Sequence, residues 1–162
     1  MKQKNDKRRN DVCIIASYGP ASTDGQFKKA DGTIREDATP QAQRRRCQDY
    51  VGFLEARQGK KCTIIEHISD EGFSGGNTNR PGYQKLLGMI VSGGIDAIIA
   101  TELSRLSRSV FDFLELVAHC EKHSVKIFVI GLDLDTSTPT GRVLVTILIA
   151  LCQFEREITA VR

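Results

Sequence analysis

One serine and three arginines are the residues of this sequence whose types and positions best suit chemistry. Ser22 lies in SYGPASTDGQ, directly after the apolar run VCIIA. Arg105 and Arg108 follow another apolar run in TELSRLSRSV, and Arg80 ends the glycine-rich stretch SGGNTNR. A hydroxyl among guanidinium groups suits attack on a phosphodiester, because the arginines would neutralise the phosphoryl oxygens in the transition state. A covalent serine intermediate would also conserve the bond energy, so broken strands could be rejoined without ATP.

Each of these residues also has a simpler structural interpretation. A serine after a strand can close a turn or cap a helix, and Arg80 can belong to a helix start capped by Asn79. Arg105 and Arg108 are three positions apart, so on a helical turn they would project from the same side as a solvated pair. Their position favours chemistry, because two guanidinium groups at the edge where a sheet binds ligands are costly without an anion.

The overall composition is that of one ordinary globular domain. The chain has 162 residues, of which 40% are hydrophobic and 27% charged, so a single core can form. The net charge of +3 permits an anionic partner, although a domain that bound nucleic acid through its overall field would be more basic. Neither a signal peptide nor a membrane-spanning apolar segment is present. We therefore expect a soluble, cytoplasmic protein.

The five cysteines are odd in number, widely spaced and mostly inside apolar segments. No C-x-x-C pair occurs, so the spacing indicates neither a zinc knuckle nor a redox pair. A disulfide framework is not expected in a chain of this size, which fits a reducing compartment. We expect no metal and no cofactor. The cysteines are interpreted as small core residues: Cys13, Cys47, Cys62, Cys120 and Cys152.

Short β-branched runs alternate with helical patterns along the chain. Buried strands are expected over residues 12–18, 62–68, 95–101 and 125–130. Helices are expected from Pro40 to Gln58, from Pro81 to Gly93, from the Ser109 cap through His123, and from Thr138-Pro139 onward. This alternation predicts an α/β fold with a mainly parallel sheet of four to five strands flanked by helices.

An α/β sheet of this kind presents its sites at the carboxyl ends of its strands. Ser22 follows the first expected strand, Asp70 the second and the SRLSR run the third. The polar stretch Phe27–Ala38 lacks periodicity, so we expect a long mobile loop beside Ser22. Residues 1–10 are expected to form a basic, flexible N-terminus, and residues 11–162 a single domain.

The last expected helix is apolar on nearly all sides in VLVTILIALCQFEREITAVR and becomes amphipathic from Gln153. One small sheet cannot bury all the apolar surface of such a helix. The pattern therefore favours association with another subunit. An ordinary core helix remains the alternative for Val143 to Leu151. No C-cap precedes Arg162, so the helix is expected to continue in a longer chain.

Five stretches, taken in order, resemble the catalytic domain of serine site-specific recombinases, the resolvase and invertase family. They are YGPASTDGQ, TPQAQRRRCQDYV, DEGFSGGNTNRPGYQKLL, SRLSRS and TPTGRVLVTILIALCQFERE. The third stretch and the end of the fifth look most like the large serine recombinases of phages and conjugative transposons. The ordered set covers nearly all of Asp11 to Arg162 and is specific, although each motif alone would be weak. The resemblance implies a resolvase-like three-layer fold with a long C-terminal oligomerisation helix.

The resemblance also implies a mechanism. Ser22 would be the nucleophile that forms a phosphoserine link with the 5′ end of cleaved DNA. Arg80, Arg105 and Arg108 would bind the scissile phosphate, and one of them would help to protonate the leaving 3′ oxygen. The implied partner is double-stranded DNA, recognised specifically through a region that would follow Arg162. The implied assembly is a homodimer that becomes a tetramer in the active synaptic complex.

Five further positions match supporting positions of the family. Gln26 and Gln43 would line the site, Asp70 would orient an arginine, and Glu155 and Arg156 would belong to the polar pair of the assembly helix. The two glutamines have simpler alternatives, because Gln26 could be only a loop residue and Gln43 only a solvated helix position.

Two positions depart from the family pattern. Pro20 stands where the family usually has an arginine two residues before the nucleophile, and proline offers no donor side chain. Ser104 stands where the family usually has an aspartate before the first arginine of DRLSR. Either a cation of the following loop replaces the arginine, or activity is reduced. The candidate cations are Lys28, Lys29 and Arg35.

Three functional hypotheses follow. The first is a recombinase catalytic domain that cuts and rejoins DNA through Ser22. The second is a non-catalytic relative, an assembly or regulatory module in which Pro20 and Ser104 mark a decayed site. The third is a small-molecule hydrolase, which the absence of a G-x-S-x-G elbow disfavours. His67, His119 and His123 are interpreted as surface residues of a strand or helix.

Overall fold

A five-stranded sheet forms the centre of the protein, in the strand order β2-β1-β3-β4-β5. The structure is a computed structural model that describes residues 12–19, 39–68, 81–107 and 109–160. The first four strands run parallel, and β5 pairs antiparallel with β4. The strands are β1 (Val12–Tyr18), β2 (Lys61–Ile68), β3 (Ala97–Ala100), β4 (Lys126–Val129) and β5 (Leu134–Asp135). The predicted mainly parallel sheet is therefore confirmed.

The four predicted helices begin and end close to where the sequence signals place them, and a short fifth helix at Leu103–Leu106 was not predicted. Thr39 caps the first of them by accepting a hydrogen bond from the Ala42 amide at 3.2 Å, and Gly59 ends it in the left-handed conformation with φ 64°. Ser109 caps another helix through the Asp112 amide at 3.0 Å. The helices are α2 (Pro40–Gln58), α3 (Pro81–Val91), α4 (Leu103–Leu106), α5 (Val110–Lys122) and α6 (Pro139–Ala160), with a 3₁₀ turn at Ile130–Leu132.

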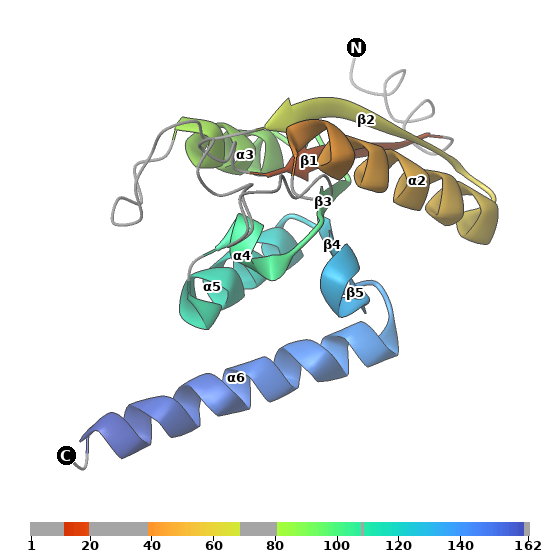
Figure 1. Cartoon of the computed structure of the whole chain (residues 1–162). Coiled ribbons are helices and arrows are strands. Elements are labelled where there is room, and N and C mark those ends of the chain that lie inside the picture. Colours follow the sequence, from red (N-terminus) through yellow and green to blue (C-terminus); the bar gives the residue numbers. More distant parts are fainter. Residues whose placement is uncertain (1–11, 20–38, 69–80, 108, 161–162) are drawn as a thin grey trace, which may run out of the picture.

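Two apolar clusters make a three-layer structure, one on each face of the sheet. Because successive side chains of a strand point to opposite faces, β3 supplies both clusters. Ile99 packs with Cys47, Val51 and Leu54 of α2, whereas Ile98 packs in the cluster that α3, α5 and α6 cover. The helices thus fall on opposite faces, with α2 alone on one of them (Figure 1).

Two expected strands are shorter than predicted. Residues 95–101 yield only Ala97–Ala100, and residues 125–130 yield only Lys126–Val129. Sheet-like hydrogen bonding nonetheless extends beyond those bounds, since the Asp96 amide donates to the Ile14 carbonyl at 2.7 Å. The two apolar runs correctly predicted which residues are buried. They do not mark the residues at which strand geometry begins or ends.

A buried aspartate joins the last strand to α2 and to the turn that leads into α6. Asp135 accepts hydrogen bonds from Arg57 of α2 and from the Ser137 amide. Burial alone would raise the pKa of Asp135, but the hydrogen bonds from Ser137 and Arg57 more than offset it, so the pKa is lowered. Asp135 therefore remains a carboxylate that fixes the turn leading into α6.

Helix α6 packs against α5 and β5 and runs well apart from α2 and β2 (Figure 1). Its 22 residues begin with Pro139 as predicted. Gly141 sits against β5 so closely that an added Cβ would lie 1.9 Å from the carbonyl oxygen of Asp135. Among the described residues, no helix is long and apolar enough to cross a membrane.

Replacing Gly141 with alanine should destabilise the protein by roughly 3 kcal/mol, because a backbone carbonyl cannot rotate away from the new methyl group. The matched control is Gly88→Ala in α3, where an added Cβ meets nothing within 4 Å. That change should stabilise by about 0.5 to 1 kcal/mol, since alanine favours helix over glycine. Urea unfolding of both variants measures the difference, and equal stabilities would contradict the close approach of α6 to β5.

Candidate active site at the carboxyl edge of the sheet

The carboxyl edge of the sheet has a topological switch point between β1 and β3. The two strands are neighbours, but the chain continues from β1 to α2 on one face and from β3 to α4 and α5 on the other. Chain segments that diverge in this way leave a crevice, and crevices of this kind bind ligands in α/β sheets. Gly19 marks the exit from β1, and its amide donates to the Ile68 carbonyl of β2 at 3.0 Å.

Most of the predicted catalytic positions lie outside the described residues. They are Ser22, Arg80 and Arg108, together with the supporting Gln26 and Asp70, the departure Pro20, the stretch Phe27–Ala38 and the N-terminal residues 1–10. Glu155 and Arg156 fall within the backbone of α6, but their side chains are not described. The gathering of three arginines around Ser22 therefore stays a prediction.

Arg105 is the one proposed catalytic arginine that the structure describes. It lies on α4, directly beyond β3, with a side chain only 21% exposed. Its Nε atom is buried and has no hydrogen-bond partner among the described residues. A guanidinium group stays charged at any ordinary pH and is costly to bury without a partner, so this position suits an anionic ligand.

Glu102 is a member of this site that the sequence reasoning missed. Its Oε2 lies 3.9 Å from Arg105 Nε and accepts a hydrogen bond from Ser104 Oγ at 3.3 Å. A carboxylate is therefore present beside Arg105 although Ser104 replaces the aspartate of the family motif. The sequence signal was the acidic residue three positions before an arginine, a spacing that brings side chains together on a helical turn.

The chain leaves helix geometry directly after Arg105 and Leu106, and Arg108 itself lies outside the described residues. Helix α4 ends at Leu106, and Ser107 is extended, with φ −146° and ψ 163°. The Ser107 hydroxyl is buried and donates to the Ser109 carbonyl at 3.0 Å, which holds the chain in this extended form. The projection of Arg105 and Arg108 from the same side therefore stays a prediction.

Gln43 lies at the site and is not the solvated helix residue of the simpler alternative. Its side chain is buried on α2. A Cβ added at Gly19 would come within 2.9 Å of Gln43 Oε1, so the amide packs against the exit from β1. Glycine at this position lets the helix approach the segment that leads to Ser22.

A buried serine and a histidine are paired across β1 and β2 next to this exit. Ser17 and His67 are register partners, and the Ser17 hydroxyl is hydrogen-bonded to His67 Nδ1. Burial lowers the pKa of His67, and Arg44 lowers it further, while Glu66 opposes the shift. His67 is thus half-buried and bonded instead of solvent-facing as predicted. No local signal could reveal the pair, because it depends on the strand register.

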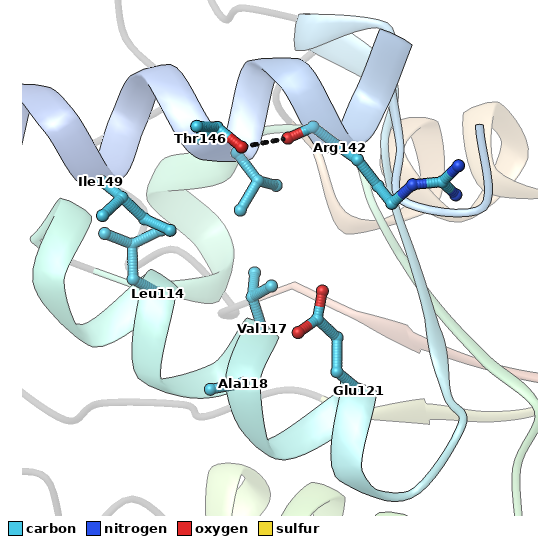
Figure 2. Close-up of a pocket in the computed structure, with 8 residues that line it drawn as sticks. Leu114, Val117, Ala118, Glu121, Arg142, Thr146 and Ile149 are labelled. Atoms are coloured by element: carbon cyan, nitrogen blue, oxygen red, sulfur yellow. Dashed lines mark hydrogen bonds between the residues drawn. The ribbon is translucent and has the colours of Figure 1, made fainter. Parts of the chain in front are cut away.

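A separate hollow lies between α5 and α6, away from the carboxyl edge. Figure 2 shows it as mostly apolar, with the Glu121 carboxylate and the Arg142 side chain at its borders. Its volume is about 230 Å³. The lining residues are Leu114, Val117, Ala118, Glu121, Arg142, Val145, Thr146 and Ile149. Within the described ranges, no cluster of three or more His, Cys, Asp or Glu side chains could hold a metal ion.

Comparison with known proteins decides the family. Residues 30–162 match the family described as "Resolvase, N terminal domain". The chain belongs to this family. The resemblance predicted from five motifs is therefore confirmed, and so is the resolvase-like α/β fold.

Individual relatives agree with this assignment of the resolvase domain. The chain is 30% identical to the serine recombinase gin of Escherichia phage Mu over 102 residues, 63% of this chain and 52% of that protein. The N-terminal catalytic domain of TP901-1 integrase superposes with a TM-score of 0.72 at 30% identity, covering 90% of this chain and 98% of the integrase domain. A resolvase family site-specific recombinase from Streptococcus pneumoniae, 20% identical with a TM-score of 0.68, shows the shared fold; 92% of this chain and 91% of that protein superpose. The chain spans about half the length of the curated relatives it matches.

Lowering the pH should reduce the free energy of unfolding of this resolvase domain, partly through protonation of His67. Its pKa is lowered in the folded chain, so below about pH 6.5 the unfolded state binds the proton more readily and stability falls as the pH falls. His67→Gln cannot titrate, and its free energy of unfolding should decline less than that of the parent between about pH 7.5 and 5.5. Urea titrations across that range test this, and parallel pH profiles would contradict it.

Proposed function

We propose that this resolvase domain is the catalytic part of a site-specific DNA recombinase that cuts and rejoins strands through Ser22. Three findings support the proposal: membership of the resolvase N-terminal domain family, the 30% identity to the TP901-1 integrase catalytic domain, and the topological switch point from which the Ser22 segment leaves. The observation that carries it is the buried Nε of Arg105 at that edge, which has no hydrogen bond within the part of the chain that the structure describes.

In this mechanism the Ser22 hydroxyl oxygen attacks the scissile phosphorus. The bond to the 3′ oxygen breaks, that oxygen takes a proton, and the 5′ end stays linked to Ser22 as a phosphodiester. Attack by the 3′ hydroxyl of another strand then reverses the step and releases the serine. Arg80, Arg105 and Arg108 would neutralise the phosphoryl oxygens throughout, so the reaction needs neither metal nor ATP.

Electrostatics around Arg105 suit this role. The nearest acidic oxygen among the described residues, from Glu102, is 3.9 Å from Nε, too far for a direct hydrogen bond. An approaching phosphate could therefore bond to the guanidinium without first displacing a tightly held carboxylate. Gln43 and the Ser17–His67 pair would support the outgoing segment from β1, and Asp70 would orient one of the arginines.

The test uses the full-length recombinase and nicked suicide DNA, which traps the covalent adduct. Ser22→Ala should abolish the adduct, and Arg105→Gln should slow its formation roughly a hundredfold to a thousandfold, the usual effect of removing one charged contact to a transition state. Lys122→Gln, an exposed cation at the end of α5, is the control and should react like the parent. An adduct that persists in Ser22→Ala would refute the nucleophile.

A non-catalytic assembly module is the second candidate, and Pro20 and Ser104 are the observations that favour it. Ser104 is weaker evidence for a decayed site than Pro20, because Glu102 supplies a carboxylate near Arg105. The candidate replacements for the arginine missing at Pro20, which are Lys28, Lys29 and Arg35, lie outside the described residues. If the site has decayed, the parent will form no adduct while the double variant Pro20→Arg, Ser104→Asp gains one. An adduct in the parent excludes this candidate.

Subunit association through α6 is the second part of the proposal. Five apolar side chains form an outer seam on α6 that faces solvent, with Phe154 59% exposed and Val143 58% exposed. The opposite side packs on α5 through Val145 and its neighbours. Only one side of Val143 to Leu151 is therefore buried, which differs from the alternative of an ordinary core helix. The outer seam consists of Val143, Ile147, Leu151, Phe154 and Ile158. We propose that it pairs subunits into the dimer and synaptic tetramer.

A charge placed in the outer seam should dissociate the subunits. Ile147→Asp puts a carboxylate into an interface that would otherwise bury it, which is strongly unfavourable. The matched control is Gln153→Asp, an exposed position off the seam on the same helix. Analytical ultracentrifugation should show Ile147→Asp with the monomer mass at concentrations where Gln153→Asp and the parent are oligomeric. Identical masses for all three would overturn the seam as the interface.

A further inference from the structure

Two cysteine thiols face each other where β1 and β2 begin. Cys13 and Cys62 are register partners in these parallel strands. Both side chains belong to the apolar cluster under α2, Cys62 as a buried member and Cys13 packed against it. Their thiols lie close enough for each to influence the pKa of the other, and both are reduced. Nothing in the cysteine spacing of the sequence indicates this pair.

The backbone geometry allows the pair to be bridged. Neighbouring strands lie about 4.8 Å apart, and disulfides form between Cα atoms about 4.4 to 6.8 Å apart. Register partners also direct their side chains to the same face. We propose that Cys13 and Cys62 form a reversible intramolecular disulfide, a modification site at the base of the strand that leads to Ser22.

Hydrogen peroxide is a sufficient oxidant for this step. One thiolate attacks the peroxide O–O bond, giving a sulfenic acid and hydroxide, which takes up the released proton as water. The second thiol attacks the sulfenic sulfur, the S–S bond forms, and a second water leaves. Two thiols lose two electrons, and one peroxide becomes two waters. A dithiol reductant returns both cysteines to the thiol form.

The pair should react slowly at neutral pH. Burial raises the pKa of Cys13 to about 11, helped by Cys62 and Asp96 and opposed by Lys126. Burial raises the pKa of Cys62 as well, and Glu55 adds to the effect while the hydrogen bond from Cys13 and the charge of Lys126 oppose it. Because the thiolate is the reactive form, the rate should rise about tenfold for each pH unit through the mildly alkaline range. An exposed cysteine would level off near its ordinary pKa of about 8.5.

The disulfide would close a loop that contains both α2 and the segment with Ser22. Oxidation would thus restrain the chain around the proposed active site without using any residue of that site.

The experiment treats the folded chain with hydrogen peroxide, blocks the remaining thiols with N-ethylmaleimide and maps the peptides by mass spectrometry. A linked Cys13–Cys62 peptide that a dithiol reductant releases is the expected product, and it should form about a hundredfold faster at pH 9 than at pH 7. Peptide mapping of the parent protein gives this result without any variant, so the test does not depend on a variant that folds.

Three variants sharpen the test. Cys13→Ser and Cys62→Ser should each lose the linked peptide, whereas Cys47→Ser, a lone buried thiol in the same apolar cluster, should keep it. A bridge from either residue to Cys47, overoxidation of Cys13 with Cys62 still free, or no change after prolonged oxidation at pH 9 would each overturn the proposal.

Discussion

The position of β1 between β2 and β3 is the constraint on which the rest of the structure depends. Its backbone pairs on both sides, from Val12↔Lys61 to Tyr18↔Ile68 and from Ile15↔Ala97 to Ser17↔Ile99. A central parallel strand cannot shift without breaking both ladders, so its carboxyl end is fixed in space. The segment that carries Ser22 therefore starts from a rigid point, beside the strand that leads to Arg105.

At the carboxyl end of β1, polar side chains replace apolar ones in the core. The cluster under α2 is apolar at the level of Ile15 and Val51, but Ser17 and Gln43 continue it toward the carboxyl edge. Buried polar groups need partners, and Ser17 has one in His67. Arg105 Nε lacks one among the described residues. This difference separates Ser17, whose polar group is satisfied within the fold, from Arg105, for which we propose an anionic ligand.

Helix α6 lies outside this arrangement and has two apolar sides. One side completes the core through Val145, and the other exposes the outer seam. Gly141 and Asp135 fix where the helix starts, whereas its later turns have little of the domain to pack against (Figure 1). The same chain thus contains a sheet with both faces covered by helices and a helix that keeps an exposed apolar seam, the surface that we propose pairs subunits.

The sequence by itself determined the α/β class, the bounds of most helices and the resolvase family. It also showed that the candidate site residues follow the carboxyl ends of strands. These features follow from local periodicity, caps and motif order. It also identified Arg105 and Gln43. Only the tertiary structure decided that Ser17 meets His67, that Cys13 meets Cys62, and that the Glu102 carboxylate lies near Arg105. Contacts between strands depend on register, which no local pattern encodes when residues are as far apart as Cys13 and Cys62. The structure also shows that helix geometry ends before Ser107, whose buried hydroxyl donates to the Ser109 carbonyl.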